Sequence, residues 1–305
     1  EGPGAPGFAA FRATSFDWTR QLRSVWRDPP HQVAALHEGC IDDILTYFEE
    51  RTREEEPDPE PLGRVVMGPA GYGKTHLVGR LRAGVWERDG WFVLLDLVGV
   101  KDFWSSIALG FLDSLHALRS ENLTQHDLLI LKLADKLGIA EQAGAIAKRH
   151  DDDPRSAMND MSALFRNALA RYDRQGTLRH RDVLTALILL TSNDLDQQSI
   201  AHAWLQGMPA TAQDVSQFGF VGDNAPITVV KGLCWLMSLV GPTLIAVDQI
   251  DAIVTAAHAG SKAAASLSEG EKAEARSILE ALAQGLMDLH EVKYRAVVVL
   301  SCLEA

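Results

Sequence analysis

The residues with the clearest chemistry form the stretch GPAGYGKT at 68–75. Its three glycines permit positive φ angles, so that successive backbone N–H groups can converge on phosphate oxygens. Lys74 can reach the outer phosphates of a nucleotide, and the Thr75 hydroxyl can bind Mg²⁺. The stretch therefore predicts a phosphate-binding loop. Its expected contacts are Gly68, Pro69, Ala70, Gly71, Tyr72, Gly73, Lys74, Thr75 and His76.

The elements expected on either side of this stretch support its role as a phosphate-binding loop. A short apolar strand, 64–67, precedes it, and a helical pattern through Leu77, Val78 and Leu81 follows it. The amino end of that helix would add N–H donors and a dipole that favours an anion. The alternative is a glycine-rich turn between a strand and a helix that carries an unrelated lysine.

A metal-binding carboxylate is predicted at the end of a second apolar strand, TLIAVD at 243–248. Asp248 is the last residue of this strand and would bind Mg²⁺ directly or through water. Lys74 and Asp248 are thus the first two catalytic candidates. The alternative role for Asp248 is to cap a helix that follows the strand.

Three acidic or polar positions and one amide are candidates for the hydrolytic step. Gln249 follows Asp248, and an amide can orient water but cannot accept its proton. Asp251 and Asp96 can act as bases, although they can equally be a helix cap and a structural hydrogen-bonding group. Ser301, at the end of a strand expected at 295–300, would lie between the two motifs and sense the outermost phosphate. Its alternative role is to begin a turn.

The pattern of apolar strands separated by helices predicts an α/β fold: a parallel sheet flanked by helices, with a long helical insertion between the second and third core strands. The second strand is expected at 91–98, and one of the inserted helices at 125–147. The expected organisation is a flexible leader at 1–24, two parts of the core at 25–101 and 241–305, and the helical insertion at 102–240.

Together these motifs resemble those of the AAA+/STAND branch of P-loop ATPases, especially origin-recognition-complex-like proteins, over about 64–98 and 241–302. The tetrapeptide DQID at 248–251, the helical insertion and the strand RAVVVLSCLE are similar to large ATPases of bacterial phage-defence systems, including the BREX type. The resemblance implies ATP and Mg²⁺ as cofactors, and a switch or motor that hydrolyses ATP. It also implies a linker helix within 25–50 that contacts adenine.

The sequence departs from the resembled family in ways that affect hydrolysis. ATPases of the additional-strand class usually carry Glu where this chain has Gln249, so we expect slow hydrolysis or the help of a partner subunit. The lid subdomain of the family is expected to be absent from 1–305. Arg276 is a candidate arginine finger or an ordinary surface residue. The alternatives for function are a nucleotide-dependent scaffold with little hydrolysis and, less favoured, a small-molecule kinase.

Composition and charge restrict the partners and the cellular location that we expect for the chain. The net charge of −12 excludes a bulk cationic surface for nucleic acid, so any DNA contact would use other regions. No apolar run is long enough to span a bilayer. The three cysteines lie far apart, which is typical of a reducing cytoplasm. We expect a cytoplasmic homo-oligomer or a subunit that joins partner proteins, with no membrane contact.

Overall fold

The computed structural model describes most of the chain between residues 25 and 302. The described residues are 25–27, 36–53, 63–69, 71–96, 102–149, 153–209, 211–248, 277, 280, 283–289 and 294–302. The predictions for the leader at 1–24 and for Ala70, Gln249, Asp251 and Arg276 lie outside these residues.

The strands form one parallel four-stranded sheet in the order β1-β4-β3-β2. Their bounds are β1 Gly63–Met67, β2 Trp91–Asp96, β3 Thr243–Asp248 and β4 Ala296–Cys302. The predicted α/β class with a parallel sheet is confirmed. The last strand, β4, lies between β1, which leads into the glycine-rich loop, and β3, which ends in Asp248.

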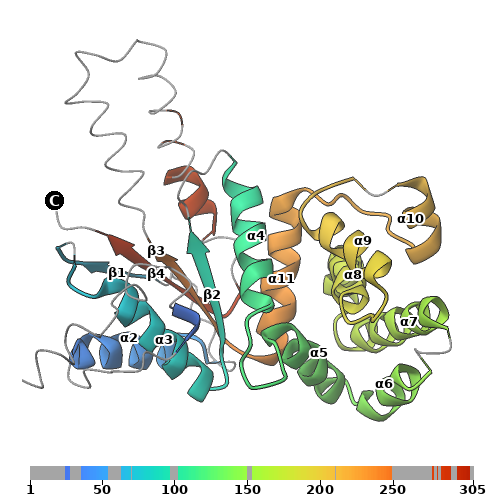
Figure 1. Cartoon of the computed structure of the whole chain (residues 1–305), viewed down its shortest axis with the longest axis horizontal. Coiled ribbons are helices and arrows are strands. Elements are labelled where there is room, and N and C mark those ends of the chain that lie inside the picture. Colours follow the sequence, from blue (N-terminus) through green and yellow to red (C-terminus); the bar gives the residue numbers. More distant parts are fainter. Residues whose placement is uncertain are drawn as a thin grey trace, which may run out of the picture.

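Helices cover both faces of the sheet (Figure 1). One face packs against α2 (Glu38–Arg51) and α3 (Lys74–Glu87), and the other against α4 (Phe103–Leu115) and α11 (Pro226–Val240). Between α4 and α11 the chain forms a helical region that extends away from the sheet (Figure 1). Its members are α5 (Gln125–Lys136), α6 (Ala140–Ala147), α7 (Pro154–Tyr172), α8 (Arg174–Leu189), α9 (Leu195–Leu205) and α10 (Ala212–Phe218).

The strand sequences explain this layered arrangement. Successive side chains of a strand point to opposite faces, and β2 is apolar on both. Phe92 and Leu94 are buried with α2 and α3. Trp91, Val93 and Leu95 belong to a cluster that continues into the helical region. A strand buried on both faces reads as a continuous apolar run, as the sequence of β2 does.

The edge of β2 is covered by side chains instead of another strand. Gln125, 1% exposed, accepts a hydrogen bond from Phe92 N–H at 3.0 Å and donates to Phe92 O at 2.9 Å. Ser114 Oγ accepts from Leu94 N–H at 3.0 Å. These side chains satisfy backbone groups that would otherwise be left unpaired at a sheet edge.

The helices differ from the sequence prediction in three places. The helix expected at 125–147 is two helices, because Gly138 adopts a φ of 67° after α5. The short helix α10 was not predicted. Where the sequence analysis expects a linker helix within 25–50, α2 begins at Glu38, after His37 in the left-handed conformation. None of the described helices is both long and apolar enough to cross a membrane.

Candidate phosphate-binding site

The glycine-rich loop joins β1 to the amino end of α3. Gly71 and Gly73 both have a φ of 82°, a conformation that side chains other than that of glycine rarely adopt. Gly73 caps α3, so the first N–H groups of that helix point into the loop without partners in their own helix. Gly68 N–H donates to Cys302 O at 3.3 Å and ties the loop to β4. This is the local geometry that an anion needs.

Lys74 lies folded over the loop. Its Nζ donates to Gly68 O at 2.8 Å and to Pro69 O at 3.2 Å. These carbonyl groups hold the ammonium group beside the loop but do not neutralise its charge. The ammonium group can therefore exchange these carbonyl partners for phosphate oxygens, which would form stronger, charge-assisted bonds.

Thr75 and Asp248 meet across the sheet, although they are far apart in the sequence. Thr75 Oγ1 donates to Asp248 Oδ2 at 3.0 Å, and Asp248 is 3% exposed. Because Mg²⁺ binds oxygens at about 2.0–2.1 Å in octahedral geometry, adjacent ligands lie about 2.9 Å apart. The separation of the Thr75 and Asp248 oxygens therefore fits two neighbouring ligands of one Mg²⁺ ion. In the alternative arrangement, Thr75 would bind Mg²⁺ directly and Asp248 would bind it through a water.

Asp96 is the described carboxylate nearest in register to Asp248. The two residues are Cα partners at the carboxyl ends of β2 and β3. Asp96 is exposed whereas Asp248 is buried. The structure thus places one candidate base, Asp96, at the carboxyl ends of the strands, where the glycine-rich loop also lies. The other candidates, Gln249 and Asp251, lie outside the described residues.

Ser301 lies on β4, between β1 and β3, where it is the Cα partner of Val66. Its side chain is buried, with 1% exposed, and its Oγ has no hydrogen-bond partner among the described residues. An unpaired buried hydroxyl is a cost that stable proteins usually avoid.

Residues at the start of α2 also contact the loop, and the sequence did not single them out. His37 Nε2 lies 2.6 Å from Tyr72 O. A Cβ atom at Gly73 would lie 3.4 Å from His37 Nε2 and 3.6 Å from Leu36 Cδ2. The only signal for this contact was the expectation that a helix within 25–50 approaches the nucleotide. Tyr72 itself is 64% exposed.

His76 occupies the first turn of α3, next to the loop. Burial lowers the pKa of His76, and the nearby charges of Arg80 and His37 lower it further. Its Nδ1 is buried without a hydrogen-bond partner among the described residues. The lowered pKa favours the uncharged form of His76 at the amino end of this helix.

Comparisons with known proteins do not identify a family for this chain. No family model matches the chain, and no curated protein or solved structure matches it either.

Proposed function

We propose that this chain binds ATP with Mg²⁺ and hydrolyses it, as an AAA+/STAND-type switch or motor module in a larger assembly. The observation that carries the proposal is the 3.0 Å hydrogen bond between Thr75 and Asp248. It joins the two motifs that the sequence predicted independently, one on the glycine-rich loop and one on β3.

Different described residues would contact the phosphates and the Mg²⁺ of the nucleotide. The N–H groups of the loop and of the first turn of α3 would hold the phosphates, and Lys74 would move from the carbonyls of Gly68 and Pro69 to the outer phosphates. Thr75 and Asp248 would hold Mg²⁺, which neutralises phosphate charge. Burial of Asp248 strengthens its electrostatic interactions because water screens them less.

The strand order supports hydrolysis over transfer of phosphate to a metabolite. β4 lies between β1 and β3, and its residue Ser301 is the Cα partner of Val66 on β1, the strand that leads into the loop. A hydroxyl at that position can respond to the presence of the outermost phosphate. This arrangement disfavours the small-molecule kinase alternative.

A second candidate function is a nucleotide-dependent scaffold with little hydrolysis. It is favoured by Gln249, the neighbour of Asp248, because an amide cannot take a proton from water. In that case Asp96, the register partner of Asp248, would not act as the base. Binding would then act through assembly with further copies or with partner proteins.

The test combines calorimetry of ATP and GTP binding in the presence of Mg²⁺ with phosphate release from the same sample. Lys74→Ala removes a charged donor, so we expect ATP to bind about 10- to 100-fold more weakly. Lys148→Ala, at an exposed position after α6, is the matched control and should bind normally. Normal ATP binding by Lys74→Ala would contradict the proposal. Tight binding without phosphate release would favour the scaffold.

A further inference from the structure

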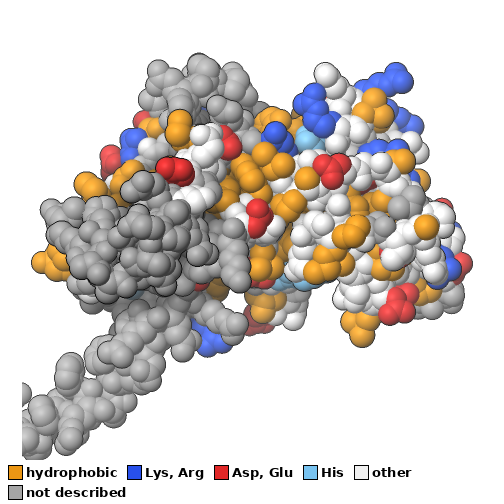
Figure 2. Space-filling view, turned by 90° about the horizontal axis from the view of Figure 1, so that it is seen from above, with side chains coloured by type: hydrophobic (Ala, Val, Ile, Leu, Met, Phe, Trp, Pro, Cys, Tyr) orange, Lys and Arg blue, Asp and Glu red, His pale blue; other side chains and the backbone are white. Residues whose placement is uncertain are grey.

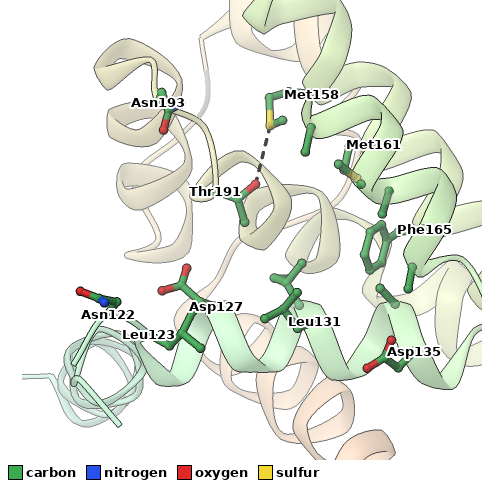
Figure 3. Close-up of a pocket in the computed structure, with 16 residues that line it drawn as sticks. Asn122, Leu123, Asp127, Leu131, Asp135, Met158, Met161, Phe165, Thr191 and Asn193 are labelled. Atoms are coloured by element: carbon green, nitrogen blue, oxygen red, sulfur yellow. Dashed lines mark hydrogen bonds between the residues drawn. The ribbon is translucent and has the colours of Figure 1, made fainter. Parts of the chain in front are cut away.

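A second site lies in the helical region, away from the glycine-rich loop. A trough of about 550 Å³ opens between α5, α6 and α7, and is closed at one end by the segments before α5 and after α8 (Figure 3). Small-molecule sites commonly have volumes of about 300–1,000 Å³. The trough is therefore large enough for a small ligand, and the proposed nucleotide function does not use it.

The hollow exists because one wall carries only small side chains. The wall from α6 consists of Ala140, Ala143, Gly144 and Ala147. A Cβ atom added at Gly144 would meet nothing within 4 Å. The facing wall, on α7, presents Met158, Met161 and Phe165 (Figure 3). Methionine side chains adapt to the shape of an apolar ligand, so this wall suits a flexible hydrocarbon chain.

The floor of the trough, on α5, is acidic at two points and apolar between them. Asp127, Leu131 and Asp135 follow one another along this helix (Figure 3). The two carboxylates are about two helical turns, or about 12 Å, apart and lie within about 80° of each other around the axis. Leu131, between them, is 52% exposed, so a ligand lying over it would remove apolar surface from water.

Among the described residues, no positive side chain lines the trough to balance these carboxylates. The lining residues include no Lys, Arg or His. Asp135 also lines a second hollow together with Lys132 and Lys136, and both lysines have other partners: Lys132 pairs with Asp89, and Lys136 Nζ donates to Leu239 O at 2.6 Å. The charge of the trough is thus negative at both ends of an apolar floor.

Asp127 also has a structural role that leaves part of its carboxylate available. Its Oδ2 accepts from Thr124 N–H at 2.9 Å and from Thr124 Oγ1 at 2.7 Å, which caps α5. The pKa of its neighbour His126 is lowered by burial, so that this imidazole supplies little positive charge. Asp127 Oδ1 can therefore accept from a ligand.

We propose that this trough binds a linear aliphatic diamine or polyamine. One ammonium group lies at Asp127, another at Asp135, and the methylene chain between them covers Leu131 and packs against α7. Charge complementarity selects a cation at each end, and the spacing of the carboxylates selects the length of the chain. The proposal does not depend on nucleotide binding.

The probe is 1,8-diaminooctane, whose extended length matches the spacing of the carboxylates, titrated into the full chain by calorimetry without nucleotide. Octylamine has one charge, 1,8-octanediol has none, and 1,3-diaminopropane is too short to reach both carboxylates even with a hydrogen bond of about 2.8 Å at each end. We expect 1,8-diaminooctane to bind at least about tenfold more tightly than each of the three, since each lacks a charge-assisted contact. Equal affinity for octylamine or for 1,3-diaminopropane would overturn the proposal.

Two pairs of variants locate the binding. Asp135→Asn should weaken binding of 1,8-diaminooctane about tenfold, whereas Asp113→Asn, exposed on α4, should not change it. Gly144→Leu fills the trough and improves helix propensity, so it should abolish binding without unfolding the chain. Ala145→Leu, exposed on the same helix but outside the trough, should leave binding intact.

Methionine methyl NMR gives a readout that does not depend on affinity. The methyl signals of Met158 and Met161 should shift on addition of 1,8-diaminooctane, while those of Met67 and Met287, which do not line the trough, should stay in place. Unchanged signals of Met158 and Met161, or full binding by Gly144→Leu, would show that the diamine binds elsewhere and would refute the assignment.

Discussion

Replacing Thr75 by Val tests the contact on which the proposed site depends. The change keeps the shape of the side chain and removes the hydroxyl that donates to Asp248 Oδ2 at 3.0 Å. Asp248 is 3% exposed, so water cannot easily replace the lost donor. A hydrogen bond to a charged group contributes about 1.5–3 kcal/mol. We therefore expect the free energy of unfolding to fall by about 2 kcal/mol, which lowers Tm by about 3 °C in a chain of this size.

The assay is urea denaturation of a double-mutant cycle. Its members are the wild type, Thr75→Val, Asp248→Asn and the double variant, with Thr75→Ser as the conservative control that keeps the hydroxyl. Because the two side chains are in contact, their effects should not add, and the interaction energy should exceed about 0.5 kcal/mol. Saturating ATP with Mg²⁺ should then raise the stability of the wild type and Thr75→Ser by more than that of Thr75→Val.

Either of two results would refute this reasoning. Unchanged stability in Thr75→Val would mean that the hydroxyl does not support Asp248. Additive effects in the cycle would mean that the two side chains act independently, and the predicted pair of magnesium ligands would lose its basis.

Three further predictions follow from buried polar groups. Gln125→Leu should cost about 3 kcal/mol or more, because it leaves both backbone groups of Phe92 unpaired; denaturation should show no such loss for Gln142→Leu, at an exposed position. Burial lowers the pKa of His180 from 6.5 to about 4. The unfolded chain therefore takes up this proton first, so stability should fall by at most about 3 kcal/mol as pH drops from about 6.5 to 4. Unfolding titrations of His180→Gln should lack this component, and an identical pH profile would contradict the assignment. Ser301→Ala removes a hydroxyl without a partner among the described residues, so stability should change by less than about 0.5 kcal/mol while phosphate release falls at least about tenfold; unchanged release would exclude a role for Ser301 in sensing phosphate.

The sequence predicted those parts of the fold that depend on local pattern. Apolar runs located the strands, and glycines at 71 and 73 anticipated the positive φ angles of the loop. The position of Asp248 at the end of β3 followed from the run that precedes it. The order of the strands was not predicted from the sequence, because the pairing of strands from distant segments leaves no local pattern.

The contacts that sequence reasoning missed are those made between distant segments. Gln125 looks like an ordinary first residue of a helix, yet its amide completes the edge of β2. His37 carries no motif, and its contact with Tyr72 depends on how α2 packs beside the loop. Gly138 could have been recognised as a helix end, because glycine readily adopts the left-handed conformation that stops α5.

The packing of β3 connects the proposed nucleotide site to the helical region. Asp248 faces the loop, whereas Val247, the preceding residue, points into the cluster that includes α4, α11 and the helices beyond them. Close-packed interiors have low compressibility and transmit strain. A shift of β3 on nucleotide binding would therefore have to move α4 and α11, which contact β2 and β3 directly. These two helices lead into and out of the helical region (Figure 1). On the face shown in Figure 2, apolar side chains gather over the described part of the molecule, while Lys and Arg lie scattered among them. Any nucleotide-dependent movement of β3 would thus reach the helical region first through α4 and α11.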